Sequence, residues 1–292
     1  MPKLSRMPKF PKLPVFPRPL VIAYKIVDRI FRIIFLLLAT YAIVFSIGVT
    51  WGAWKAYNYG MEILNEVRVL ETKNPKMSKY MEALQDSSPR LKIRHKFVPL
   101  DSISPWLRKA VIASEDAGFY YHPGFDVKAI ADAMDANRTR GKTVFGGSTI
   151  TQQISKNLFL SSERSWERKG KELVYALLME KYLGKDRILE LYLNYAQWGQ
   201  DMFGCEVACE QYFKKTCAKI SMENAINLAA VLASPGKHRP DMMNSQFMAK
   251  RRAVIYGNMF GPDSSRDSTK SDSTKVTDSL AVESETETEE AE

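Results

Sequence analysis

Residues 168–194 read RKGKELVYALLMEKYLGKDRILELYLN. Apolar side chains recur through the first part of this stretch at helical spacing, which predicts a helix over 168–183. Gly184 should end that helix, because glycine readily adopts the backbone conformation that follows a helix. A second periodic run covers 186–194. Strand signals are scarce elsewhere between 93 and 260, so the fold is predicted to be mainly α.

A run of 22 residues without a charge, 33–54, reads IIFLLLATYAIVFSIGVTWGAW. At 1.5 Å per residue this run can cross a hydrocarbon core of about 30 Å as one transmembrane helix. Trp51 and Trp54 stand at its outer end, where indole rings favour the interface. Eight Lys or Arg residues precede the run against Asp28 alone, which predicts a cytoplasmic N-terminus. A cleaved signal peptide or a buried core helix fits this length and composition less well.

Composition divides the rest of the chain into four segments. Residues 1–32 form a basic, Pro-rich cytoplasmic arm, and the spaced prolines favour an extended chain over 1–19. Residues 55–92 are polar and mixed, and are predicted to be a helical stalk. Residues 93–260 carry the motifs. From 261 to 292 the chain is acidic and rich in Ser and Thr, so this tail is predicted to be disordered.

The formal net charge of +9 is unevenly distributed. Residues 263–292 contain ten acidic and three basic side chains, a net of −7, which leaves +16 for residues 1–262. A basic body suits an anionic partner such as a phosphate-rich ligand, a membrane surface or nucleic acid. Charge alone does not choose among these partners.

Cysteine usage argues against a disulfide framework. Cys205, Cys209 and Cys217 give an odd count. Cys205 and Cys209 lie four residues apart, as neighbours on one helix face would. The three histidines are widely separated, and a zinc site would need a tighter cluster with a second ligand pair. Buried structural cysteines are the better interpretation, and no metal ligands are predicted.

The segment 114–126, SEDAGFYYHPGFD, follows an apolar helical run at 110–113. Its acids, Glu115 and Asp116, therefore stand where a helix meets a loop. A carboxylate beside apolar walls can become a usable proton acceptor. Taken alone, the same residues also fit a structural acid cluster at a helix end, with His122 as a structural histidine.

Two further motifs carry polar and basic side chains. GGSTITQQISKN, at 146–157, opens with two glycines and should wind into a helix whose free N–H groups, with Lys156 nearby, suit a pyrophosphate. An ordinary capped helix start has the same pattern. RKGKE, at 168–172, sets Arg168 one turn from Glu172. This pattern is usual for a solvated salt-bridged face, but beside a pyrophosphate it would clamp the anion.

Together, the motifs resemble the peptidoglycan glycosyltransferases, a mainly α, lysozyme-like family, and more closely its monofunctional branch. The resemblance covers about residues 97–240 and is carried by EDAGFYYHPGFD (115–126), GGSTITQQ (146–153), RKGKE (168–172), KDRILELYLN (185–194) and ENAINLAAVLASP (223–235). Three residues depart from the family pattern, and Gly118 puts one substrate contact in doubt. The other two are Gly184, where a helix-capping hydroxyl is usual, and Lys214, where a glycine is usual.

The resemblance implies a reaction and a set of site residues. Glu115 would be the general base on the 4-hydroxyl of an acceptor lipid II, which attacks the donor glycan and expels undecaprenyl pyrophosphate with inversion. Glu172 would be the second catalytic carboxylate, and Lys156 and Arg168 would stabilise the pyrophosphate. The implied substrate-binding residues are Asp116, Phe119, His122, Ser148, Thr149, Gln152, Gln153, Lys156, Arg168 and Lys169.

The resemblance also implies partners and a location. The partners would be lipid II, the nascent glycan strand, the membrane and other cell-wall synthesis or division proteins, without nucleic acid. The location would be the bacterial inner membrane, crossed once, with the catalytic domain in the periplasm. A tightly bound cofactor is not expected, although a divalent cation, Mg²⁺ or Mn²⁺, would suit a pyrophosphate. A wall-cleaving lysozyme-like enzyme and a non-catalytic membrane scaffold are the alternatives.

Overall fold

A computed structural model of the chain describes residues 17–140, 147–161 and 165–261. Most of the predicted extended arm, Gly146 of the second motif and the predicted tail from 262 onward lie outside these ranges. The chain divides into two compact units, residues 1–62 and 63–292.

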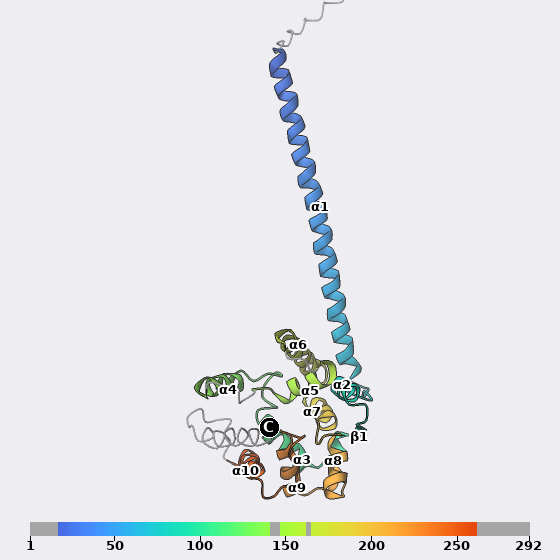
Figure 1. The fold of residues 1–292 in the computed structure, drawn as a ribbon, viewed down its shortest axis with the longest axis vertical. Coiled ribbons are helices and arrows are strands. Elements are labelled where there is room, and N and C mark those ends of the chain that lie inside the picture. Colours follow the sequence, from blue (N-terminus) through green and yellow to red (C-terminus); the bar gives the residue numbers. More distant parts are fainter. Residues whose placement is uncertain (1–16, 141–146, 162–164, 262–292) are drawn as a thin grey trace, which may run out of the picture. The chain divides into compact units, whose positions relative to one another are not determined.

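One long helix, α1 (Arg18–Val69), accounts for the described part of the first unit (Figure 1). It contains the predicted span 33–54, whose side chains are almost all exposed. Among the described residues, α1 is the one helix long and apolar enough to cross a membrane. The helix begins at Arg18, so the second half of the arm predicted over 1–32 is helical. Pro19 is tolerated there because the first turn has no partner for its missing N–H.

The second unit begins inside α1 and includes much of the predicted stalk, 55–92. Ile63, Val67 and Leu70 are buried in the core of the second unit. Ile63 and Val67 lie one turn apart on the same face of α1, and Leu70 follows the last residue of the helix. The polar average composition of this segment gave no sign of this buried stripe. The compact domain therefore starts at Ile63 and not at residue 93.

Helices dominate the second unit, which confirms the mainly α fold class. Two strands of two residues each, β1 (Arg94–His95) and β2 (Met202–Phe203), pair in parallel with Arg94 opposite Met202. The helices after α1 are α2 (Lys79–Ser87), η1 (Leu100–Ser102), α3 (Pro105–Glu115), α4 (Val127–Arg140), α5 (Ile150–Phe159), α6 (Trp166–Tyr182), α7 (Gly184–Tyr195), α8 (Cys205–Phe213), η2 (Cys217–Lys219), α9 (Met222–Val231) and α10 (Gln246–Phe260).

The helices of this unit form two packed groups. Helix α3 packs against α9 and α10, while α5 packs against α2, α6 and α7. Figure 1 shows α6 at one end of the unit and α9 at the other, and both views place α4 at an outer edge. The groups share one core, in which Trp198, Tyr192 and Phe203 are among the largest fully buried side chains.

The stretch 168–194 folds into the two helices that its periodicity predicts, α6 and α7. Gly184 begins the second helix with a backbone φ of +74°, a left-handed conformation that glycine adopts without steric cost. The buried face of α6 carries Glu172, Tyr175 and Met179. Glu172 therefore faces the interior of the unit and not the solvent.

Asn194, at the end of α7, ties that helix to the segment before η1. Its side chain is fully buried, accepts from the Val98 N–H at 2.8 Å, and donates to the carbonyls of Val98 (2.9 Å) and Glu190 (2.8 Å).

We expect Asn194→Ala to lower the free energy of unfolding by about 2–4 kcal/mol, because buried backbone groups lose their partners. Urea unfolding in detergent measures this loss. Asn244→Ala, at an exposed position, is the control, and equal effects of the two substitutions would contradict the prediction.

Candidate active site

Glu115 occupies the C-terminal end of α3, and 12% of its side chain is exposed. Its Oε1 accepts hydrogen bonds from the Ser114 hydroxyl (2.8 Å) and from Nη2 of Arg251 (3.2 Å). Its Oε2 accepts from the side-chain amide of Gln153 on α5, at 3.2 Å. The structure thus brings the first motif and the second motif together at this carboxylate, with an arginine from α10.

Asp116 and His122 fasten the loop after α3 to the start of α5. Asp116 accepts from Nε2 of His122 at 2.8 Å and from the backbone N–H of Ile150 at 3.0 Å. The N–H of Gly124 donates to Nδ1 of His122 at 3.2 Å, so a neutral ring would carry its proton on Nε2 and donate it to Asp116. Both side chains are almost fully buried, and these hydrogen bonds position the two motifs.

Burial raises the pKa of Asp116, against the opposing effects of the hydrogen bonds from His122 and Ile150. A carboxyl whose pKa is raised on folding binds protons more tightly in the native state, so its contribution to stability falls as pH rises. The unsubstituted protein and Asp116→Asn differ in free energy of unfolding, and we expect this gap to narrow as pH rises from about 4 through the raised pKa of Asp116. Chemical denaturation at several pH values measures this gap. A gap that widens with rising pH would contradict the expectation.

Three other predicted substrate-binding side chains are buried in supporting contacts. Phe119 is 0% exposed, and Nζ of Lys185 lies 4.5 Å from the centre of its ring. Thr149 and Gln152 form a reciprocal capping box at the start of α5. The Thr149 hydroxyl also donates to the carbonyl of Gly124 at 2.7 Å. Phe119 has no exposed surface in the described conformation, so its ring supports the loop after α3. The substrate contact that the resemblance implied for it stays a prediction.

Gly124 must be a glycine at this position. Its φ is +95°, and a Cβ there would lie 2.9 Å from Cγ of Glu180 and 3.3 Å from the carbonyl oxygen of Ala176. The loop can therefore approach α6 closely only with no side chain at residue 124.

The third motif forms a charged cluster at the start of α6. Glu172 exposes 4% of its side chain, and its two carboxylate oxygens accept from Nη1 of Arg168 (2.9 Å) and from Nζ of Lys169. The Lys169 amine also donates to the Ser148 hydroxyl, at 3.2 Å. Arg168 is mostly buried, whereas Lys169 is partly exposed. Two cations against one buried carboxylate leave this cluster with positive charge for an anion.

Helix α5 connects the two clusters. Ser148, just before the helix, contacts Lys169, while Gln153 on its first turns contacts Glu115. Lys156 lies further along the same helix and is exposed. Five of the ten predicted substrate-binding residues retain accessible surface beside the two carboxylates or along α5. They are Ser148, Gln153, Lys156, Arg168 and Lys169.

Comparison with known proteins shows the family. A family model described as transglycosylase matches residues 82–260. The chain belongs to the transglycosylase family. Relatives named biosynthetic peptidoglycan transglycosylase include those of Ralstonia nicotianae, 46% identical over 58% of this chain and 73% of the relative, and Burkholderia thailandensis, 41% identical over 71% and 82%. The relative from Paraburkholderia phytofirmans is 38% identical over 72% of this chain and 86% of its own length.

Sequence reasoning missed two side chains of this candidate site, Arg251 and Tyr192. Arg251 also donates to the Ser114 hydroxyl at 2.6 Å, and the Tyr192 hydroxyl donates to Oε1 of Gln153 at 3.1 Å. Burial and the nearby charge of Glu115 raise the pKa of Tyr192, so it remains a hydrogen-bond donor. Arg251 lies beyond the motifs in a basic run, which is ordinarily a solvated helix face, so its sequence carried no signal.

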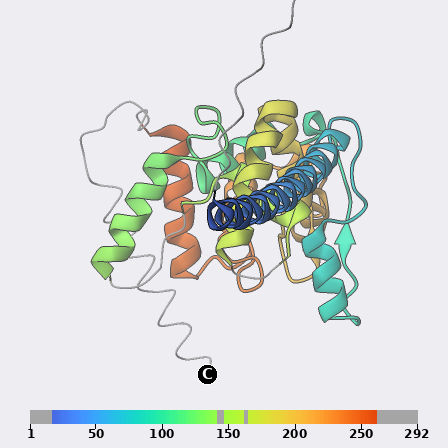
Figure 2. The same ribbon diagram turned by 90° about the horizontal axis from the view of Figure 1, so that it is seen from above.

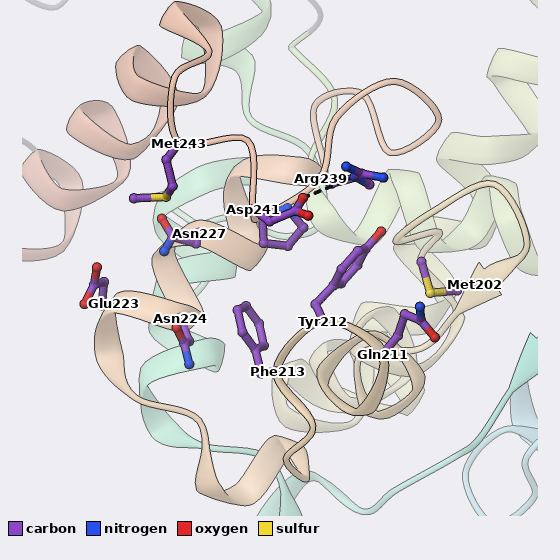
Figure 3. A pocket seen from close by; sticks show the side chains of 11 residues that line it. Met202, Gln211, Tyr212, Phe213, Glu223, Asn224, Asn227, Arg239, Asp241 and Met243 are labelled. Atoms are coloured by element: carbon purple, nitrogen blue, oxygen red, sulfur yellow. Dashed lines mark hydrogen bonds and ion pairs between the residues drawn. The ribbon is translucent and has the colours of Figure 1, made fainter.

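A cavity of about 560 Å³ lies elsewhere on the transglycosylase, beside α8 and α9 (Figure 3). Tyr212 and Phe213 point into it from the end of α8, Asn227 faces it from α9, and Arg239 pairs with Asp241 at its edge. Its lining includes none of the predicted site residues. This cavity is therefore separate from the clusters around Glu115 and Glu172.

Proposed function

We propose that the protein polymerises lipid II into glycan strands for cell-wall synthesis. The growing undecaprenyl-pyrophosphate-linked glycan is transferred to the 4-hydroxyl of an acceptor lipid II, with inversion to a β-1,4 linkage. The observation that carries this proposal is that α5 and the residue before it link two clusters: a fixed carboxylate at Glu115 on α3, and a cationic cluster around Glu172 on α6. Family membership supplies the reaction class.

In this proposal Glu115 removes the proton from the acceptor hydroxyl as its oxygen bonds to the anomeric carbon of the donor. A sugar hydroxyl is a poor nucleophile until a positioned base accepts its proton. Hydrogen bonds from Ser114, Gln153 and Arg251 support this role because they hold the carboxylate in one orientation. Arg251 is a positioning residue, since it acts through Ser114 and Glu115.

The bond from the anomeric carbon to the pyrophosphate oxygen breaks in the same step, and its electron pair stays on the pyrophosphate. That group leaves readily only if the developing charge is stabilised. Arg168 and Lys169 are suited to this task because one buried carboxylate neutralises only one of their two charges. Lys156, exposed on α5, would add a further cation to the same leaving group.

A divalent cation bound with the pyrophosphate stays a prediction, because Mg²⁺ in such sites needs only one or two carboxylates beside the phosphates. Within the described ranges, no group of three His, Cys, Asp or Glu side chains could hold a metal ion. Both oxygens of Glu172 already accept from cationic side chains, and such a donor set suits an anion.

The long apolar helix is compatible with a single-pass anchor, and we propose that it holds the enzyme in the bacterial inner membrane. The basic residues before the span favour a cytoplasmic N-terminus and a periplasmic catalytic domain. The lipid substrate would then be drawn from the same bilayer. We also propose that other cell-wall synthesis or division proteins work beside it, because glycan strands must be cross-linked after polymerisation.

The decisive experiment supplies two substrates to the purified full-length enzyme in detergent. With labelled lipid II we expect long glycan products that lysozyme digests, as a β-1,4 linkage requires. With finished peptidoglycan we expect no soluble fragments. Fragments from finished peptidoglycan, without polymer from lipid II, would instead show a wall-cleaving enzyme. Absence of both products from a folded sample would favour a scaffold.

A further inference from the structure

The three cysteines, which the proposed reaction does not use, meet in the core beside η2. Cys205 and Cys209 come from α8 and Cys217 begins η2, and all three side chains are fully buried. The Sγ atoms of Cys209 and Cys217 are 2.7 Å apart. The sequence placed the first two on one helix face but did not indicate that the third would join them.

The geometry selects one pair among the three. Cys205 and Cys209 are four residues apart on a helix, where Cβ atoms are about 5–6 Å apart. A disulfide needs Cβ atoms about 3.5–4.5 Å apart, so these two cannot bond without distorting α8. Cys217 approaches from a different element and interacts with both thiols of α8. Its contact with Cys209 is a close one, with the two Sγ atoms 2.7 Å apart. Cys209 and Cys217 are therefore the pair whose sulfur atoms are placed to form a disulfide.

The backbone holds Cys217 in this position from two sides. Its N–H donates to Oε2 of Glu206 at 2.8 Å, and its carbonyl accepts from the N–H of Ser104 at 3.1 Å. Between the two cysteines the chain turns at Lys214, whose φ of 55° is left-handed. A non-glycine residue in that conformation is unfavourable, so the short loop is held in place by its ends.

We propose that Cys209 and Cys217 form an intramolecular disulfide and leave Cys205 as the free thiol. The oxidant is a small-molecule or protein disulfide. One cysteine thiolate attacks it to give a mixed disulfide, and the second displaces the remaining thiol, so the oxidant leaves as two thiols. In the cell this step rests on the proposed periplasmic orientation, because the cytosol keeps thiols reduced.

Such a bond would be structural, and it would close one wall of the cavity beside α8 and α9. The loop that it closes carries Gln211, Tyr212 and Phe213, which line that cavity (Figure 3). Burial raises the pKa of the Cys217 thiol, and a buried thiol exchanges slowly because its thiolate is disfavoured. The bond should therefore form while the segment folds and resist reduction afterwards.

The test alkylates the full-length protein, isolated from membranes, under denaturing conditions before and after reduction. Mass spectrometry of its peptides locates each label. We expect Cys205 to be labelled before reduction, and Cys209 and Cys217 to be labelled only after it. Three labelled cysteines before reduction, or a bond that includes Cys205, would count against the proposal in membrane-isolated protein.

A second experiment tests the disulfide independently of the membrane orientation of the protein. The reduced, purified protein is equilibrated with reduced and oxidised glutathione, which requires no particular cellular compartment. If the membrane sample is reduced but glutathione produces the Cys209–Cys217 bond, the site is upheld and the periplasmic orientation fails. If neither sample contains this bond, the proposal is overturned.

Matched alanine variants give an independent readout. Cys205→Ala should keep the bond, whereas Cys217→Ala should abolish it and expose the thiol of Cys209 to labelling after denaturation. Reduction should lower the melting temperature of the unsubstituted protein and of Cys205→Ala by about 5–10 °C, because a closed loop of this length restricts the unfolded chain. Cys217→Ala should show no such response to reductant. An equal response in all three proteins would contradict the assignment.

Discussion

Glu115→Gln is expected to lower the turnover of lipid II by about 100-fold or more. Glutamine keeps the size of the side chain and one acceptor for the bonds from Ser114, Gln153 and Arg251. It cannot accept a proton from the acceptor hydroxyl at neutral pH. The rate of glycan synthesis, measured with labelled lipid II in detergent, reports this loss.

Glu167→Gln provides the matched control, because Glu167 is an exposed acid on α6 that pairs with Lys171. Its activity should be near that of the unsubstituted enzyme. Circular dichroism and thermal unfolding must show both variants folded. Near-normal polymerisation by folded Glu115→Gln would remove Glu115 from the role of general base.

Arg168→Ala is expected to weaken binding of the donor pyrophosphate by about 10–100-fold, the loss of one charge-assisted contact in a largely buried setting. The same substitution leaves Glu172 with Lys169 as its described partner. Binding of moenomycin, a phosphoglycolipid inhibitor of this family, measures the phosphate contact without turnover. Arg168→Lys should recover only part of the affinity, because lysine keeps the charge but not the planar fork.

Lys171→Ala is the control on the same helix, since Lys171 pairs with the exposed Glu167 and is not in the cluster around Glu172. Its affinity for moenomycin should be unchanged. If Arg168→Ala and Lys171→Ala bind the inhibitor equally well, the pyrophosphate is held elsewhere. A similar fall in both variants would indicate general electrostatic attraction to a basic domain.

Local patterns in the sequence were enough to predict the class of fold and the family. Helical periodicity over 168–194 predicted two helices with a break at Gly184, and the structure has α6 and α7 there. Side-chain spacing along one segment is a local property, so it can be read without knowing what the segment packs against. The span 33–54 was predictable for the same reason.

Other features depend on which segments meet. The polar average over 55–92 predicted a stalk, yet Ile63 and Val67 are buried because the rest of the unit packs on their stripe. Phe119 stands in a motif of predicted substrate-binding residues, yet its ring lies in the core. Burial is decided by neighbours distant in sequence, which composition does not record.

By itself, the sequence determined the helical class, the apolar span and the chemical groups available, because each follows from side chains within a single segment. Only the tertiary structure decided that Arg251 reaches Glu115 and that Cys217 reaches Cys209. Each of these contacts joins elements that approach one another only through packing of a shared core. The free energy of such contacts depends on distance and burial in three dimensions, which no local pattern specifies.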